Sequence, residues 1–83
     1  MEPLRRLLPS INSLVVFEVA GRLSSFSGAA RELGMTQAAV SYAIHRLENQ
    51  LGIALFLREH RRVTLSEAGQ KFHADVTIGL SHI

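Results

Sequence analysis

Three arginines near residue 60 are the side chains whose types and spacing most clearly suggest a chemistry. Arg58, Arg61 and Arg62 fall within five positions, with His60 among them and Glu59 as the one acid. Guanidinium groups neutralise and hydrogen-bond phosphate, so a local basic cluster is typical of nucleic-acid contact. On charge alone a solvated surface run is the simpler explanation, because the formal net charge is only +2.

A second polar group lies on one face of the segment 37–51. At about 100° per residue, the opposite face is an apolar stripe made of Val40, Ala43, Ile44, Leu47 and Leu51. The polar face carries Ala38, Tyr42, His45, Arg46 and Asn49, with Ser41 at its edge and Gln37 in the first exposed turn. Such side chains can hydrogen-bond to base edges in the major groove, and Ala38 suits a thymine methyl group. Solubility alone also favours a polar face, but usually one of Glu and Lys.

Other chemistries find little support in the sequence. The four histidines include no i, i+4 pair on one helix and no carboxylate constellation, which favours solvated histidines over a metal site: His45, His60, His73 and His82. The chain has no cysteine, no recognisable Ser-His-Asp or paired-carboxylate arrangement and no Gly-rich phosphate loop. We therefore expect neither catalysis nor a cofactor.

Helical periodicity with short breaks organises the first two thirds of the chain. We expect helices over about 12–22, from residue 25 or 27 to 33, and over 37–51. Suitable capping and terminating residues flank them: Ser10 or Asn12, Gly34, Thr36 and Gly52. The tight turn between the second and third helices, with the small Ala29 and Ala30 nearby, is typical of a helix-turn-helix.

A hairpin and a last helix follow. Two β-prone stretches, 55–58 and 63–65, enclose the basic cluster, and Ser66 can cap the helix in which Gly69 costs about 1 kcal/mol relative to Ala. That helix has an apolar stripe: Ala68, Phe72, Val76, Gly79 and Ile83, with Leu80 beside it. We expect Phe72 to pack on the first helix. We expect the later members to meet the same helix of a second chain, with burial against the first helix as the alternative.

The expected fold is mainly α. It is a winged helix-turn-helix with a three-helix core and a two-stranded wing over residues 1–65, followed by a linker helix over 66–83. At 83 residues there is room for one small domain. No apolar run is long enough to cross a bilayer, and Arg5 and Arg6 precede no apolar stretch of a secretory signal. We expect a cytoplasmic protein without membrane association.

The chain resembles the LysR-type transcriptional regulators from the first helix onward. The matching segments are 14–17 (LVVF), 25–33 (SFSGAAREL), 36–41 (TQAAVS), 44–48 (IHRLE) and 51–58 (LGIALFLR), with Arg61, Val63, Leu65, Ala68 and Gly69. The opening 8–14 (LPSINSL) is most similar to the branch of glycine-cleavage and β-lactamase regulators. The match runs in register and without gaps over nearly the whole chain after Pro9, which makes it far more specific than a bare helix-turn-helix pattern.

The resemblance implies roles for individual residues. Base contacts are implied for Gln37, Ala38, Ser41 and Tyr42, and phosphate contacts for Thr36, Arg46 and Arg58. Arg61 matches a wing residue that can enter the minor groove, and we expect His45 and Arg62 to join the interface. Each residue keeps a simpler alternative: Thr36 as a cap only, Arg46 as solvated, Arg58 as a brace against Glu48. The family often has Arg, Gln or His at the position of Tyr42, so no base preference carries over.

The resemblance also implies a longer protein and its partners. Such regulators continue into a long linker helix and a small-molecule effector domain, which these 83 residues lack. The expected partner is double-stranded DNA with an inverted repeat, bound by a homodimer through the last helix (Phe72, Val76, Gly79, Leu80, Ile83). The full-length protein is expected to be a tetramer. A winged-helix module that binds proteins is the alternative, although its contact face should be more apolar.

Overall fold

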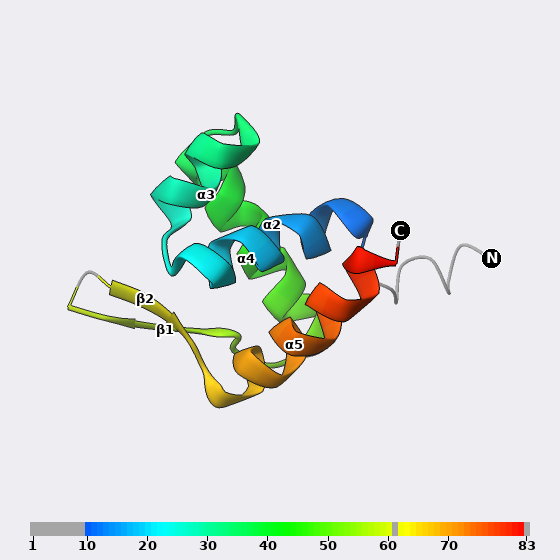
Figure 1. Ribbon diagram of the computed structural model, residues 1–83. Helices are drawn as coiled ribbons and strands as arrows, with labels where there is room; N and C mark the ends of the chain where they lie inside the picture. Colours follow the sequence, from blue (N-terminus) through cyan, green and yellow to red (C-terminus); the bar gives the residue numbers. More distant parts are fainter. Residues whose placement is uncertain (1–9, 61, 83) are drawn as a thin grey trace.

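The computed structural model describes residues 10–60 and 62–82, which form four helices and a two-stranded antiparallel sheet (Figure 1). The elements in chain order are α2 (Ile11–Leu23), α3 (Phe26–Leu33), α4 (Gln37–Leu51), β1 (Phe56–Glu59), β2 (Arg62–Leu65) and α5 (Glu67–Ser81). The hairpin projects away from the packed helices α2, α3 and α4, and α5 returns along α2. This arrangement confirms the predicted winged helix-turn-helix.

Local side chains fix where the helices begin and end. Each helix starts at a hydroxyl side chain that accepts the backbone N–H three residues on, at 2.8 to 3.1 Å: Ser10, Ser25, Thr36 and Ser66. Each such cap stabilises its helix by about 1 kcal/mol. Gly34 (φ 67°) and Gly52 (φ 71°) end α3 and α4 in the left-handed conformation, as predicted.

The core is assembled around Phe17 of α2. Its ring meets Phe56 of β1 edge-on, with centroids 5.7 Å apart, and Phe72 of α5 at 5.3 Å. Val40, Ile44 and Leu47 of α4 are fully buried, which confirms most of the predicted apolar stripe, and Ala29 and Ala30 are buried in α3. Residues from early and late segments of the chain therefore fill the interior. They pack against the buried face of α4 and hold that helix in place.

Gly69 corrects an expectation drawn from helix propensity. A Cβ at this position would lie 2.1 Å from the carbonyl oxygen of Leu55, which is closer than any real contact. The same carbonyl accepts the N–H of Ser66 at 2.9 Å, and the Ser66 hydroxyl donates to the carbonyl of Ala54 at 2.7 Å. The first turn of α5 thus sits directly on the backbone before β1, and glycine is required there rather than merely tolerated.

The wing is a regular hairpin that starts and ends close to the predicted limits. Its register pairs Phe56 with Leu65 at the base and Glu59 with Arg62 at the tip. His60, which follows β1, has φ 50°, the left-handed conformation that primed hairpin turns require. Glu48 of α4 anchors the base of the wing by accepting backbone N–H groups there.

Candidate nucleic-acid interface

Helix α4 presents the polar face that its sequence predicts. Gln37, Ala38, Tyr42, His45 and Arg46 are exposed, Tyr42 at 66%, while Ser41 is half-buried. Thr36 does cap the helix, accepting the N–H of Ala39. Since a capping hydroxyl keeps further hydrogen-bonding capacity, this cap leaves a phosphate contact open to it. The outer surface of α4 is thus free to meet a ligand along its first three turns.

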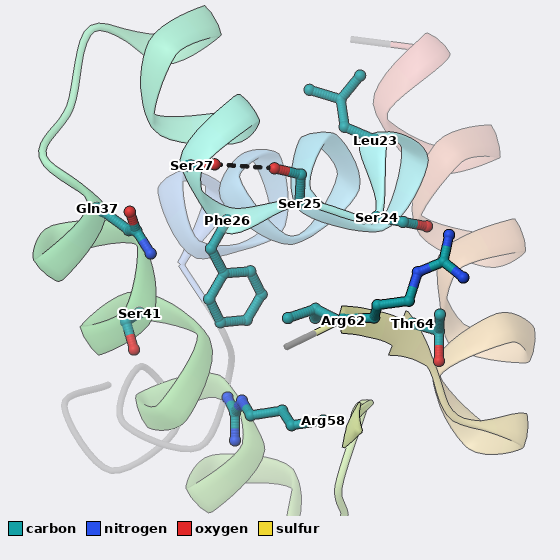
Figure 2. Close-up of a pocket in the computed structure, with 11 residues that line it drawn as sticks. Leu23, Ser24, Ser25, Phe26, Ser27, Gln37, Ser41, Arg58, Arg62 and Thr64 are labelled. Carbon is teal, nitrogen blue, oxygen red and sulfur yellow. Dashed lines mark hydrogen bonds between the residues drawn. The ribbon is translucent and has the colours of Figure 1, made fainter. Parts of the chain in front are cut away.

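A groove runs between α4, the start of α3 and the wing. Its volume is about 710 Å³, and its lining includes Gln37 and Ser41 of α4, Arg58 of β1, and Arg62 and Thr64 of β2. Figure 2 shows Gln37 and Ser41 on successive turns at one side, with Arg62 and Thr64 at the other and Phe26 between them. Residues predicted separately as base-side and phosphate-side thus share one concave surface.

The start of α3 is part of this surface, which the sequence did not indicate. Ser25 and Ser27 line the groove, and their hydroxyl oxygens lie 3.2 Å apart. The sequence predicts Ser25 only as a helix start, and Ser25 does cap α3 by accepting the N–H of Gly28 at 2.8 Å. The unpaired N–H groups of a first helical turn attract anions. A serine cap shows where a helix starts, but only the packing shows which surface that start faces.

Arg58 of the wing contacts an aromatic ring rather than a carboxylate. The guanidinium of Arg58 lies 5.5 Å from the centroid of the Phe26 ring, within range of a cation–π contact. The predicted alternative, a brace between Arg58 and Glu48, is wrong. One carboxylate oxygen of Glu48 instead accepts the backbone N–H groups of Leu55 and Phe56, at 2.8 and 3.2 Å. Glu48 therefore fixes the base of the wing, and Arg58 keeps its charge for an outside partner.

The ion pairs show which arginines are neutralised within the fold and which keep their charge for a partner. Arg22 of α2 binds Glu18 at 3.2 Å and Glu32 of α3 at 2.6 Å, and the Glu32 hydrogen bond and charge raise its pKa above the usual arginine value. Arg46, Arg58 and Arg62 have no ion pair within residues 10–60 and 62–82. Arg61 lies outside the described residues. Arg46 lies on α4, Arg58 and Arg62 lie on the wing, and Arg31 of α3 is likewise without an ion pair among the described residues.

A second, apolar groove lies between α5 and the start of α2. Its volume is about 380 Å³, and it is lined by Ile11, Leu14, Phe72, Asp75, Val76, Gly79 and Leu80. Phe72 packs on Phe17 as predicted. Val76 is only 7% exposed and belongs to the core, so most of its surface is already covered within one chain. A Cβ at Gly79 would meet nothing within 4 Å. Ile83, the remaining residue of the predicted dimer seam, lies outside the described residues.

The histidines form no metal centre in the part of the chain that is described, where no three His, Cys, Asp or Glu residues come together. His73 is instead a packing residue. Its Nε2 lies 2.9 Å from the carbonyl oxygen of Glu18, and its ring meets Phe17 edge-on. Among the described residues, no helix has the length and hydropathy needed to span a membrane.

The fold and this surface define a winged helix-turn-helix domain with an exposed recognition helix and a basic wing. A profile of bacterial regulatory helix-turn-helix proteins of the lysR family matches residues 11–70. Because this match covers most of the chain, the chain belongs to the lysR family.

Named relatives agree with this assignment. The chain is 49% identical over 69 residues to the glycine cleavage system transcriptional activator of Escherichia coli (strain K12). That stretch is 83% of this chain and 23% of the activator, so the chain spans about a quarter of the length of such relatives. The similarity to the glycine-cleavage regulators is thereby confirmed. The relatives are transcriptional regulators, as expected for a chain predicted to carry no catalysis.

Two solved structures are similar to the chain over most of their own length. The complex of BenM_DBD with catB site 1 DNA has 32% identity and a TM-score of 0.84, covering 88% of this chain and 81% of that one. The CbnR_DBD–DNA complex has 28% identity and a TM-score of 0.82, covering 87% and 83%. Their agreement with the described fold confirms the predicted architecture.

Proposed function

We propose that this chain is the DNA-reading head of a longer bacterial transcriptional regulator, with α4 in the major groove. The observation that carries the proposal is the groove in which Gln37 and Ser41 of α4 face Arg58 and Arg62 of the wing. A duplex presents base edges between two phosphate backbones, so a reader needs both kinds of group on one surface. The similar domains solved as DNA complexes support this function over a protein-binding module.

The proposed contacts follow from position along α4. Gln37, Ala38, Ser41 and Tyr42 occupy its first two turns and read base edges. Arg46, one turn later, lies toward the backbone. The remaining phosphate contacts come from the cap of α4, the start of α3 and the wing: Thr36, Ser25, Ser27, Arg58, Arg62 and Thr64. Arg61, by its place in the sequence, reaches the adjacent minor groove.

We further propose that two heads pair through α5 and bind an inverted repeat. The apolar groove between α2 and α5 offers Leu80 and the open site at Gly79 to the α5 helix of a second copy. Val76 forms part of its lining and contributes only its small exposed remainder. A two-fold pair of readers matches a two-fold DNA site, because half-site spacing mirrors the spacing of the recognition helices.

The rest of the regulator is proposed from the family. A small-molecule effector domain would follow α5, and the full-length protein would assemble into a tetramer in the bacterial cytoplasm, where its operator lies. We propose residues 1–65 as the reading head and residues 66–83 as the start of the linker. Effector binding would then change the spacing between heads rather than the reading surface itself.

A salt titration of binding to duplex DNA tests the function. Because arginines displace counterions from phosphate, the observed affinity should fall steeply and linearly with salt on logarithmic axes. Selection from random duplexes at moderate salt should then enrich one inverted-repeat site. Absence of duplex binding even at low salt, or selection without any enriched sequence, would contradict a sequence-specific reader.

A further inference from the structure

His45 lies on the line of α4 that starts at the groove. Gln37, Ser41 and His45 are four residues apart, so their side chains stack along one face at intervals of about 6 Å. Gln37 and Ser41 line the groove beside the wing, and His45 continues the same row as an exposed side chain. A ligand that extends from the groove along the first three turns of α4 therefore meets His45.

In the neutral ring, a backbone contact indicates which nitrogen of His45 carries the proton. Nδ1 lies 2.9 Å from the carbonyl oxygen of Ser41 and 3.5 Å from its hydroxyl. A carbonyl oxygen has no proton to give, so Nδ1 must be the donor. In a neutral imidazole only one nitrogen carries a proton, which leaves Nε2 as an acceptor with its lone pair outward. Within residues 10–60 and 62–82, nothing hydrogen-bonds Nε2.

An outward acceptor discriminates among the groups of the major groove. Only the amino groups of adenine (N6) and cytosine (N4) donate there. Thymine O4 and guanine O6 and N7 accept, as phosphate oxygens do. We propose that His45 is a specificity-determining residue whose Nε2 accepts from the amino group of one adenine or cytosine. Thymine or guanine at that position would place an acceptor atom against the lone pair of Nε2, and the interaction would be repulsive.

This inference rests on the proposed function and assigns His45 to bases rather than to backbone. A histidine that binds phosphate must offer a proton from its outer nitrogen, whereas in the neutral ring the contact with Ser41 places the single proton on Nδ1. The two roles differ in measurable ways. A base contact changes the affinity for some sequences only, whereas a phosphate contact changes all affinities alike and contributes to the salt slope.

Two substitutions can test the two ring nitrogens separately, because each one retains a polar group near the position of only one nitrogen. His45→Asn places its amide near the position of Nδ1 and loses the outer acceptor, while His45→Gln reaches the position of Nε2 with an amide oxygen. Asn49→Ala is the matched control, because Asn49 is exposed one turn further along the same line. All three changes lie on the surface of α4, so circular dichroism should show the same helix content.

The experiment measures affinity of the parent and the three variants for every single-base variant of the selected site. The parent should favour adenine or cytosine at one base, by roughly 5- to 150-fold. His45→Asn should abolish that preference, His45→Gln should keep one at the same base, and Asn49→Ala should change nothing. Nitrogen-15 spectra of the free chain at neutral pH should show the His45 proton on Nδ1.

Three results would overturn the inference while the proposed function stands. They are an Nε2-protonated His45, a uniform loss of affinity in His45→Asn with a shallower salt slope, and a His45→Asn profile equal to that of the parent. Failure of the parent to bind any duplex would instead overturn the proposed function, and the inference with it.

Discussion

Replacing Arg62 with alanine should remove about one phosphate contact from the DNA complex. Arg62 lines the groove beside α4 and has no ion pair among the residues described, so its charge is not used within the fold. Each neutralised phosphate contributes about −0.9 to the slope of log affinity against log salt. Over a fourfold rise in salt, roughly from 50 to 200 mM, that slope corresponds to an affinity loss of about 3.5-fold.

With Arg46, Arg58, Arg61 and Arg62 as contacts, the parent should have a slope near about −3.6. Across the same salt range it should lose affinity by about 150-fold, against about 40-fold for Arg62→Ala with a slope of about −2.7. Fluorescence anisotropy with one labelled duplex at several salt concentrations gives both slopes.

Lys71→Ala is the matched control for charge alone. It removes one positive charge from α5, where the side chain is 80% exposed and 4.0 Å from Glu67. The slope of this variant should equal that of the parent. An unchanged slope in Arg62→Ala, or an equal change in Lys71→Ala, would refute the assignment of Arg62 to the interface.

Two further predictions concern stability and assembly. Gly69→Ala should lower the midpoint of thermal unfolding, because the Cβ clash with the Leu55 carbonyl outweighs the gain in helix propensity of about 1 kcal/mol; a midpoint equal to or above that of the parent would contradict the packing described. Gly79→Glu should shift the chain toward monomer in sedimentation equilibrium without unfolding it, since the added side chain meets only the open groove. Ile78→Glu, also on α5 but outside the groove lining, is its control, and a parent that is already monomeric at high concentration would defeat this prediction.

Much of the fold could be predicted because its signals are local. A serine or threonine cap acts on an N–H three residues away, and a glycine end needs only its own backbone angle, so Thr36, Ser66, Gly34 and Gly52 were predictable. The apolar stripe of α4 likewise follows from helical periodicity. The polar face opposite it followed at the same time, which is why the exposed residues of α4 were expected correctly.

The remaining features depend on contacts between distant segments. Glu48 accepts the N–H groups of Leu55 and Phe56, which lie seven and eight residues later, beyond the end of α4. Helical periodicity predicts only that Glu48 lies on α4. Gly69 looked unfavourable because propensity says nothing of the Leu55 carbonyl it rests on. The burial of Val76 within one chain could not be predicted, because the sequence does not show how far along α2 the last helix packs. Ser25 and Ser27 joined the groove only once α3 was placed beside the wing.

The central claim is that Gln37 and the residues on its row of α4 read bases while Arg46 and the wing hold the backbone. The measurement that tests it most directly is the affinity of Gln37→Ala and Arg46→Ala for every single-base variant of the selected site. Gln37→Ala should lose about 1–3 kcal/mol on the preferred site and relax the preference at one base pair. Arg46→Ala should weaken binding to all sequences by similar factors and leave the preferences unchanged. A uniform loss in Gln37→Ala together with an erased base preference in Arg46→Ala would contradict the claim.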